Sequence, residues 1–77
     1  MKKLIVLGPG CPRCDALANL TRLAADQLGI EYQLEKLRDI TQFSKFGLMM
    51  TPGLVVDGEL KVHGKVPSLD ELKAILA

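Results

Sequence analysis

The strongest constraint on this fold is a long helical pattern that lies between two short strand-like segments. The segment from Pro12 to Leu28 repeats its apolar residues at helical spacing, and Gly29 follows it as a C-terminal stop. The apolar run from Lys3 to Leu7 is too short for a helix and ends at a Gly-Pro-Gly turn, which predicts a buried strand. Residues 30–35 alternate between apolar and polar side chains, which predicts a half-buried strand. A strand, a helix of this length and another strand predict a right-handed crossover with parallel pairing.

Turn and capping residues divide the rest of the chain into shorter elements. Asp39 is placed to cap a short helix that ends at Gly47 and turns three residues inward, Ile40, Phe43 and Phe46. The apolar segments 54–56 and 60–62 flank the dipeptide Asp57-Gly58, which accepts positive φ and predicts a tight hairpin.

The last predicted helix begins after Ser68, where Glu71 three residues later completes a capping box. Its apolar residues share one side, namely Leu69, Leu72, Ile75 and Leu76. The element order β-α-β-α-β-β-α predicts an α/β fold, with a four-stranded mixed sheet and helices on both faces. At 77 residues the chain is about the minimum size for independent folding, so we expect one domain over residues 1–77.

Composition and charge exclude several classes of function. The 10 Lys and Arg residues against 9 Asp and Glu leave a net charge of +1, so nucleic acid is not an expected partner. The apolar start breaks at Gly8 before it reaches the length of a secretory core, and no apolar run approaches a membrane span. We therefore expect a monomeric cytoplasmic protein without a membrane partner. Five basic residues are expected to be ordinary solvated charges, namely Lys2, Lys3, Arg22, Lys36 and Arg38.

The two cysteines form a Cys-X-X-Cys motif, Cys11-Pro12-Arg13-Cys14, and in a reducing compartment such a pair is more often catalytic or metal-binding than structural. Gly10 and Pro12 flank the first cysteine and indicate an exposed turn. With Cys11 as the N-cap, Pro12 takes the first helical position, where its missing N–H costs nothing. The backbone N–H groups of Arg13 and Cys14 then face the Cys11 sulfur, and the helix dipole adds positive potential. These effects favour a nucleophilic thiolate, as would an Arg13 side chain turned toward the sulfur.

Cys14 is the predicted resolving thiol, although the motif alone leaves other interpretations open. Residues three apart at a helix start bring their α-carbons to about 5 Å, a separation that a disulfide tolerates. The same two thiolates could carry copper(I) or zinc, but tetrahedral zinc needs four ligands and only His63 adds to the two sulfurs. His63 is more simply a surface side chain. A third interpretation is a binding module in which the two cysteines no longer react.

Thr51-Pro52, just before the predicted hairpin, is the second candidate region. Most X-Pro bonds are trans, so the residues alone favour an ordinary turn. A cis bond would turn the Thr51 backbone outward beside Cys11, where its N–H and C=O could pair with an extended substrate. The apolar residues that precede Thr51 should be mostly core, although any exposed methionine among them would suit a docking patch. They are Phe46, Leu48, Met49 and Met50.

These features together resemble the thioredoxin superfamily, in particular the minimal prokaryotic thioredoxin-like proteins called redox-active disulfide proteins. The likeness rests on residues 8–14, on residues 51–61 and on Gly64 before the last helix, and it keeps the element order over the whole chain. The chain departs from better-known relatives because it has no Trp and no acidic residue in its first strand. Arg13 also stands where a glutaredoxin has tyrosine.

The resemblance implies a thiol-disulfide oxidoreductase in which Cys11 is the nucleophile and Cys14 is the resolving thiol. It implies that Pro52 is a cis-proline opposite them, so that Thr51 and Pro52 present the backbone that binds substrate. The expected partners are a disulfide-containing protein substrate and a reductase or thiol donor. No cofactor and no metal is required, because the dithiol itself carries two electrons.

Overall fold

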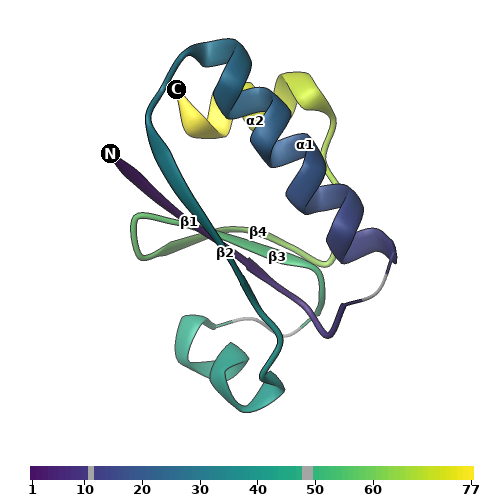
Figure 1. Ribbon diagram of the computed structural model, residues 1–77. Coiled ribbons are helices and arrows are strands. Elements are labelled where there is room, and N and C mark those ends of the chain that lie inside the picture. Colours follow the sequence, from purple (N-terminus) through teal and green to yellow (C-terminus); the bar gives the residue numbers. More distant parts are fainter. Residues whose placement is uncertain (11, 48–49) are drawn as a thin grey trace.

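The computed structural model describes residues 1–10, 12–47 and 50–77. Along the chain it contains β1 (Lys2–Leu7), α1 (Pro12–Leu28), β2 (Tyr32–Leu37), the 3-10 helix η1 (Ile40–Phe46), β3 (Gly53–Val56), β4 (Glu59–His63) and α2 (Leu69–Leu76) (Figure 1). The predicted element order is confirmed, and the second helix takes the tighter 3-10 form. No helix within the described part of the chain is long and apolar enough to span a bilayer.

The four strands form one mixed sheet in the order β2-β1-β3-β4. β1 and β2 run parallel, as predicted, while β3 runs antiparallel to both β1 and β4. The second strand begins and ends two residues later than the alternation at 30–35 predicted. Its bounds follow instead from its partner, because every residue of β1 from Lys2 to Leu7 pairs with one of β2 from Tyr32 to Leu37.

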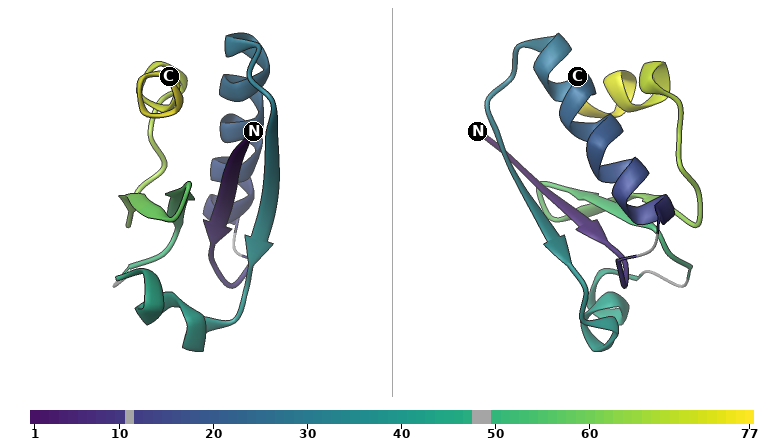
Figure 2. Two further views of the ribbon diagram at one scale, coloured as in Figure 1. Left: turned by 90° about the vertical axis from the view of Figure 1, so that its left-hand side faces the viewer. Right: turned by 45° about the vertical axis from the view of Figure 1, so that its right-hand side comes forward.

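Alternate residues of β1 supply two apolar clusters on opposite faces of the sheet. Leu4 and Val6 face α1 and α2, where they join the larger buried cluster, which also contains Leu17, Ala18, Ala24, Ala25, Leu54, Val56, Val62, Leu72 and Leu76. Leu7 on the other face is buried with Val55 and with Phe43 of η1. Figure 2 shows η1 well apart from the two α-helices, so the predicted helices on both faces are present, with the shorter one alone on its side.

Side-chain caps fix where the helices begin and end. The Asp39 carboxylate accepts hydrogen bonds from the Thr41 hydroxyl at 2.7 Å and from its backbone N–H at 3.0 Å, and these bonds hold the pKa of Asp39 below its usual value. Gly47, at φ 80°, then ends η1 in the left-handed region. At α2 the predicted capping box is confirmed, because the Glu71 N–H donates to the Ser68 Oγ at 3.2 Å and the Ser68 N–H to the Glu71 Oε1 at 3.3 Å.

Candidate functional site

The sheet register brings the candidate residues to one edge. Leu7 of β1 pairs with Leu37 of β2 and with Gly53 of β3, and Gly53 in turn pairs with His63 of β4. These positions form one row across the sheet, beyond which each strand joins its loop. The Cys-X-X-Cys turn follows β1, Arg38 follows β2, the Thr51-Pro52 segment precedes β3, and Gly64 follows β4. Residues far apart in the sequence therefore meet around the turn from β1 to α1.

The turn from β1 to α1 carries the two cysteines of the motif. Cys11, the predicted nucleophile, lies outside the described residues. Before it, Gly10 adopts a φ of 95°, which glycine accepts without strain. After it, the exposed Pro12 is the first residue of α1, a position that suits proline because no helical hydrogen bond is lost there. Cys14 lies in the first turn of α1 and is buried, with 4% of its surface exposed.

Gly8 and Cys14 pack directly against one another. A Cβ built on Gly8 would overlap the Cys14 Sγ and would lie 2.9 Å from the Cys14 Cβ. Both residues are buried, so neither can relieve such an overlap by turning into solvent. Only glycine fits at position 8, and its missing side chain leaves the space that the Cys14 sulfur occupies beside the turn.

The Thr51–Pro52 peptide bond is cis, which is the isomer that the family resemblance implied. Pro52 is fully buried, and its carbonyl accepts a 2.8 Å hydrogen bond from the Gly64 N–H. Thr51 is half-buried and makes no hydrogen bond with any residue in the described part of the chain. Its backbone N–H and C=O, the groups predicted to pair with an extended substrate, therefore have no partner among those residues.

The Arg13 side chain turns to the loop between β4 and α2. Its Nη2 donates a 3.1 Å hydrogen bond to the Gly64 carbonyl, and the Gly64 N–H bonds to Pro52. The sequence suggested that Arg13 could turn toward a cysteine sulfur, whereas the structure gives the guanidinium a backbone partner. Arg13 thus joins the start of α1 to the loop between β4 and α2, and that loop in turn is hydrogen-bonded to the cis-proline.

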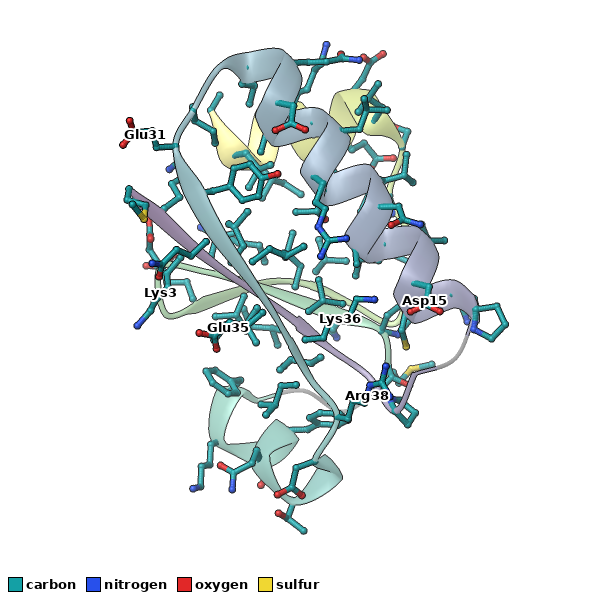
Figure 3. The ribbon with its side chains drawn as sticks, in the orientation of Figure 1. Lys3, Asp15, Glu31, Glu35, Lys36 and Arg38 are labelled. Carbon is teal, nitrogen blue, oxygen red and sulfur yellow. The ribbon has the colours of Figure 1, made fainter. Side chains whose placement is uncertain are left out.

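Arg38, which the sequence analysis interpreted as a solvated charge, is exposed but also lies beside the cysteine turn, a position that was not predicted. A Cβ built on Gly10 would lie 3.6 Å from the Arg38 Cζ and 3.8 Å from its Nη1, so the guanidinium packs over the residue that precedes Cys11. In Figure 3, Arg38 lies at the end of β2, next to the turn that leads into α1. Parallel pairing was the available signal, since it puts the ends of β1 and β2 at the same edge.

Lys36 forms an ion pair, although it was expected to be an ordinary solvated charge. Its Nζ lies 3.3 Å from the Asp15 Oδ1, and Figure 3 shows the two side chains between β2 and the start of α1. This ion pair links the first turn of α1 to the strand that ends near Arg38. It also neutralises Asp15, the acidic residue in the first turn of the helix.

Two further predictions concern the apolar residues before Thr51 and the single histidine. Met50 is 64% exposed and lies over Gly64. Phe46 is half-buried and packs against the cluster of Leu7, Phe43 and Val55. Leu48 and Met49 lie outside the described residues. His63 is exposed at the end of β4, as predicted for a surface side chain. Within the described residues, no group of three or more His, Cys, Asp or Glu side chains is arranged to hold a metal ion.

Comparison with known proteins agrees with the family resemblance found in the sequence. The family model described as the thioredoxin domain matches residues 1–77. A protein named thioredoxin from Methanothermobacter thermautotrophicus is 43% identical over 77 residues, which is the full length of both chains. Another of that name, from Methanocaldococcus jannaschii, is 31% identical over 68 residues, covering 88% of this chain and 78% of the relative. The chain therefore belongs to the thioredoxin-domain family.

Proposed function

We propose that this protein is a thiol-disulfide oxidoreductase that reduces substrate disulfides through Cys11 and Cys14. Membership of the thioredoxin-domain family supports a redox function in general. The observation that carries the specific proposal is the contact between Gly8 and the Cys14 sulfur. It holds the Cys14 sulfur beside the turn from β1 to α1, the turn that contains Cys11 in the sequence, which supports a disulfide between the two that forms without refolding the domain.

The start of α1 supplies the activation that the nucleophile needs. The first N–H groups of a helix have no intrahelical partners, and the helix dipole makes this end positive. Pro12 at the first helical position has no N–H, so the next backbone donors along the chain after Cys11 belong to Arg13 and Cys14. A thiol at this position is expected to have a lowered pKa and to ionise near neutral pH.

The reaction then follows from thiol-disulfide exchange. The Cys11 thiolate attacks one sulfur of the substrate disulfide; that bond breaks, and the other substrate sulfur leaves as a thiolate and takes up a proton. The Cys14 thiol loses its proton and attacks the Cys11 sulfur of the mixed disulfide, which releases the first substrate sulfur as a thiol. The substrate gains two electrons and two protons, and the protein is left with a Cys11–Cys14 disulfide. A dithiol reductant from outside must reduce it for another turnover.

The Thr51-Pro52 segment supports a role in holding the substrate chain. Thr51 precedes β3 at the same edge as the cysteine turn, and its backbone makes no hydrogen bond within the described residues. An extended substrate paired to the N–H and C=O of Thr51 would pass beside the turn that contains Cys11. Main-chain pairing of this kind suits many sequences, which fits an enzyme that acts on protein disulfides.

Single-cysteine variants provide the decisive experiment. The protein is mixed with a model peptide disulfide and a dithiol reductant, and release of peptide thiol is followed. In a second assay, with pre-reduced protein and no added dithiol, Cys14→Ser is expected to trap a covalent mixed disulfide at Cys11, seen by mass spectrometry, whereas Cys11→Ser is expected neither to trap substrate nor to reduce it. The proposal is wrong if the wild-type protein reduces no disulfide, or if both variants turn over at the wild-type rate.

A further inference from the structure

We infer that Arg38 makes the site selective for disulfides whose cysteine lies close to a carboxylate in an acidic peptide segment. This inference rests on the proposed function, since it names the substrate class for the same site. It starts from the position of the guanidinium, which packs over Gly10, the residue immediately before Cys11. A charge held there faces whatever approaches the cysteine turn.

The contact with Gly10 also explains how Arg38 reaches this position. A Cβ built on Gly10 would lie 3.6, 3.7 and 3.8 Å from the Cζ, Nε and Nη1 of Arg38, so the guanidinium occupies the space where a side chain at position 10 would begin. Leu37, the preceding residue, is the last of β2 and pairs with Leu7 at the end of β1. The sheet therefore delivers the Arg38 side chain directly to the turn.

The guanidinium of Arg38 is not neutralised within the part of the chain that the structure describes. It forms no ion pair or hydrogen bond there, and Arg13 nearby bonds to a carbonyl, which leaves its charge uncancelled. Of the nearby carboxylates, Asp15 pairs with Lys36 and Glu71 with Lys65, while that of Asp39 accepts hydrogen bonds from Thr41 and forms no ion pair with either arginine. Two positive charges thus flank the cysteine turn without a carboxylate opposite them among the described residues.

A guanidinium in this setting suits a carboxylate, because its planar donors match the two carboxylate oxygens. The distance limits where that carboxylate can lie in the substrate. Residues two apart in an extended chain are about 7 Å from each other, and Arg38 lies beside Gly10, which directly precedes Cys11 in the sequence. A Glu or Asp within two residues of the substrate cysteine can therefore reach Arg38 while the disulfide lies at Cys11.

The test uses two model peptide disulfides that differ only at the residues flanking the cysteine, which are Glu in one and Gln in the other. The ratio of kcat/KM for the Glu peptide to that for the Gln peptide is measured in low salt. For the wild-type protein we expect a ratio of about two to five, the range that an exposed charge pair provides. The ratio should fall toward one in high salt, because added ions screen the pair.

Variants then assign the preference to one side chain. Arg38→Gln is expected to bring the ratio to about one at low salt. Arg22→Gln is the matched control, since it removes the same charge from an exposed position ten residues beyond Pro12, about 15 Å along α1, and should keep the wild-type ratio. Because each ratio compares two substrates of one variant, a general change in thiol reactivity cancels.

The outcomes separate this inference from the function on which it rests. Reduction of both peptides at equal rates by the wild-type protein overturns the selectivity and leaves the oxidoreductase proposal standing. A preference that survives in Arg38→Gln also overturns it, because another group would then recognise the carboxylate. If neither peptide is reduced, the proposed function and the inference fail together.

Discussion

Replacing Gly8 by Ala is expected to destabilise the reduced protein, because the new methyl group would occupy the position of the Cys14 sulfur. The Cβ added at position 8 would overlap the Cys14 Sγ and lie 2.9 Å from the Cys14 Cβ. Gly8 is buried and Cys14 is only 4% exposed, so the overlap must be relieved by movement of the helix start or of β1.

The size of the effect follows from two opposing contributions. Overpacking of a buried site costs about 1–3 kcal/mol. A glycine without a positive φ gains about 0.4–1 kcal/mol when Ala replaces it, because the unfolded chain loses freedom, and Gly8 is not among the positive-φ glycines. At the centre of these ranges the net loss is about 1.3 kcal/mol, which corresponds to a fall in Tm of roughly 5–10 °C for a domain of this size.

A double-mutant cycle measured by urea unfolding of the reduced proteins tests the cause. Gly8→Ala is compared in the wild-type and Cys14→Ala backgrounds. Removing the sulfur should relieve most of the overlap, so Gly8→Ala should cost at least about 1 kcal/mol less in the Cys14→Ala background than in the wild type. Equal costs in the two backgrounds would refute the reasoning, since the sulfur would then not be the atom that excludes a side chain at position 8.

Further predictions concern the links around the site and the last helix. Arg13→Gln should lower kcat/KM for disulfide reduction by roughly two- to tenfold, because the loop at Gly64 loses its tie to α1; an unchanged kcat/KM would contradict this. Ser68→Ala should cost about 1 kcal/mol in urea unfolding, through loss of the α2 cap, and no loss would argue against the cap. The Ser68 N–H, and then Lys65, lower the pKa of Glu71, so its contribution to stability is present above its unfolded value near 4.5 and is lost as pH falls through the folded pKa. Glu71→Gln should therefore flatten the decline of the urea midpoint between about pH 5 and pH 3, and an unaltered pH profile would refute this assignment.

The sequence predicted most accurately those features that local chemistry determines. The bounds of α1 agree with prediction at both ends, because Pro12 is suited to a first turn and Gly29, at φ 69°, to a left-handed stop. The caps at Asp39 and Ser68 were predicted for the same reason, since each acts within three residues of the chain. Such interactions are encoded by neighbours and need no knowledge of the rest of the fold.

The features that the sequence did not predict depend on contacts between distant segments. The bounds of β2 follow from pairing with β1, and the position of Arg38 follows from those bounds. The direction of the Arg13 side chain depends on a carbonyl 51 residues away. The capping residues of η1, Asp39 and Gly47, were identified correctly, whereas its 3-10 form was not predicted.

Strand order determines how the parts of the proposed site can cooperate. β1 lies between β2 and β3, so the turn that begins at Gly8 has Arg38 on one side and the cis Thr51–Pro52 bond on the other. Neighbouring strands are about 4.8 Å apart, so the ends of β2 and β3 each lie about that far from the end of β1, where the cysteine turn begins. A substrate chain held by Thr51 must therefore cross the cysteine turn before its flanking residues reach Arg38. Recognition of backbone and recognition of charge would then act on opposite sides of the reacting disulfide, so a variant at Arg38 should change which substrates are preferred without removing the pairing at Thr51.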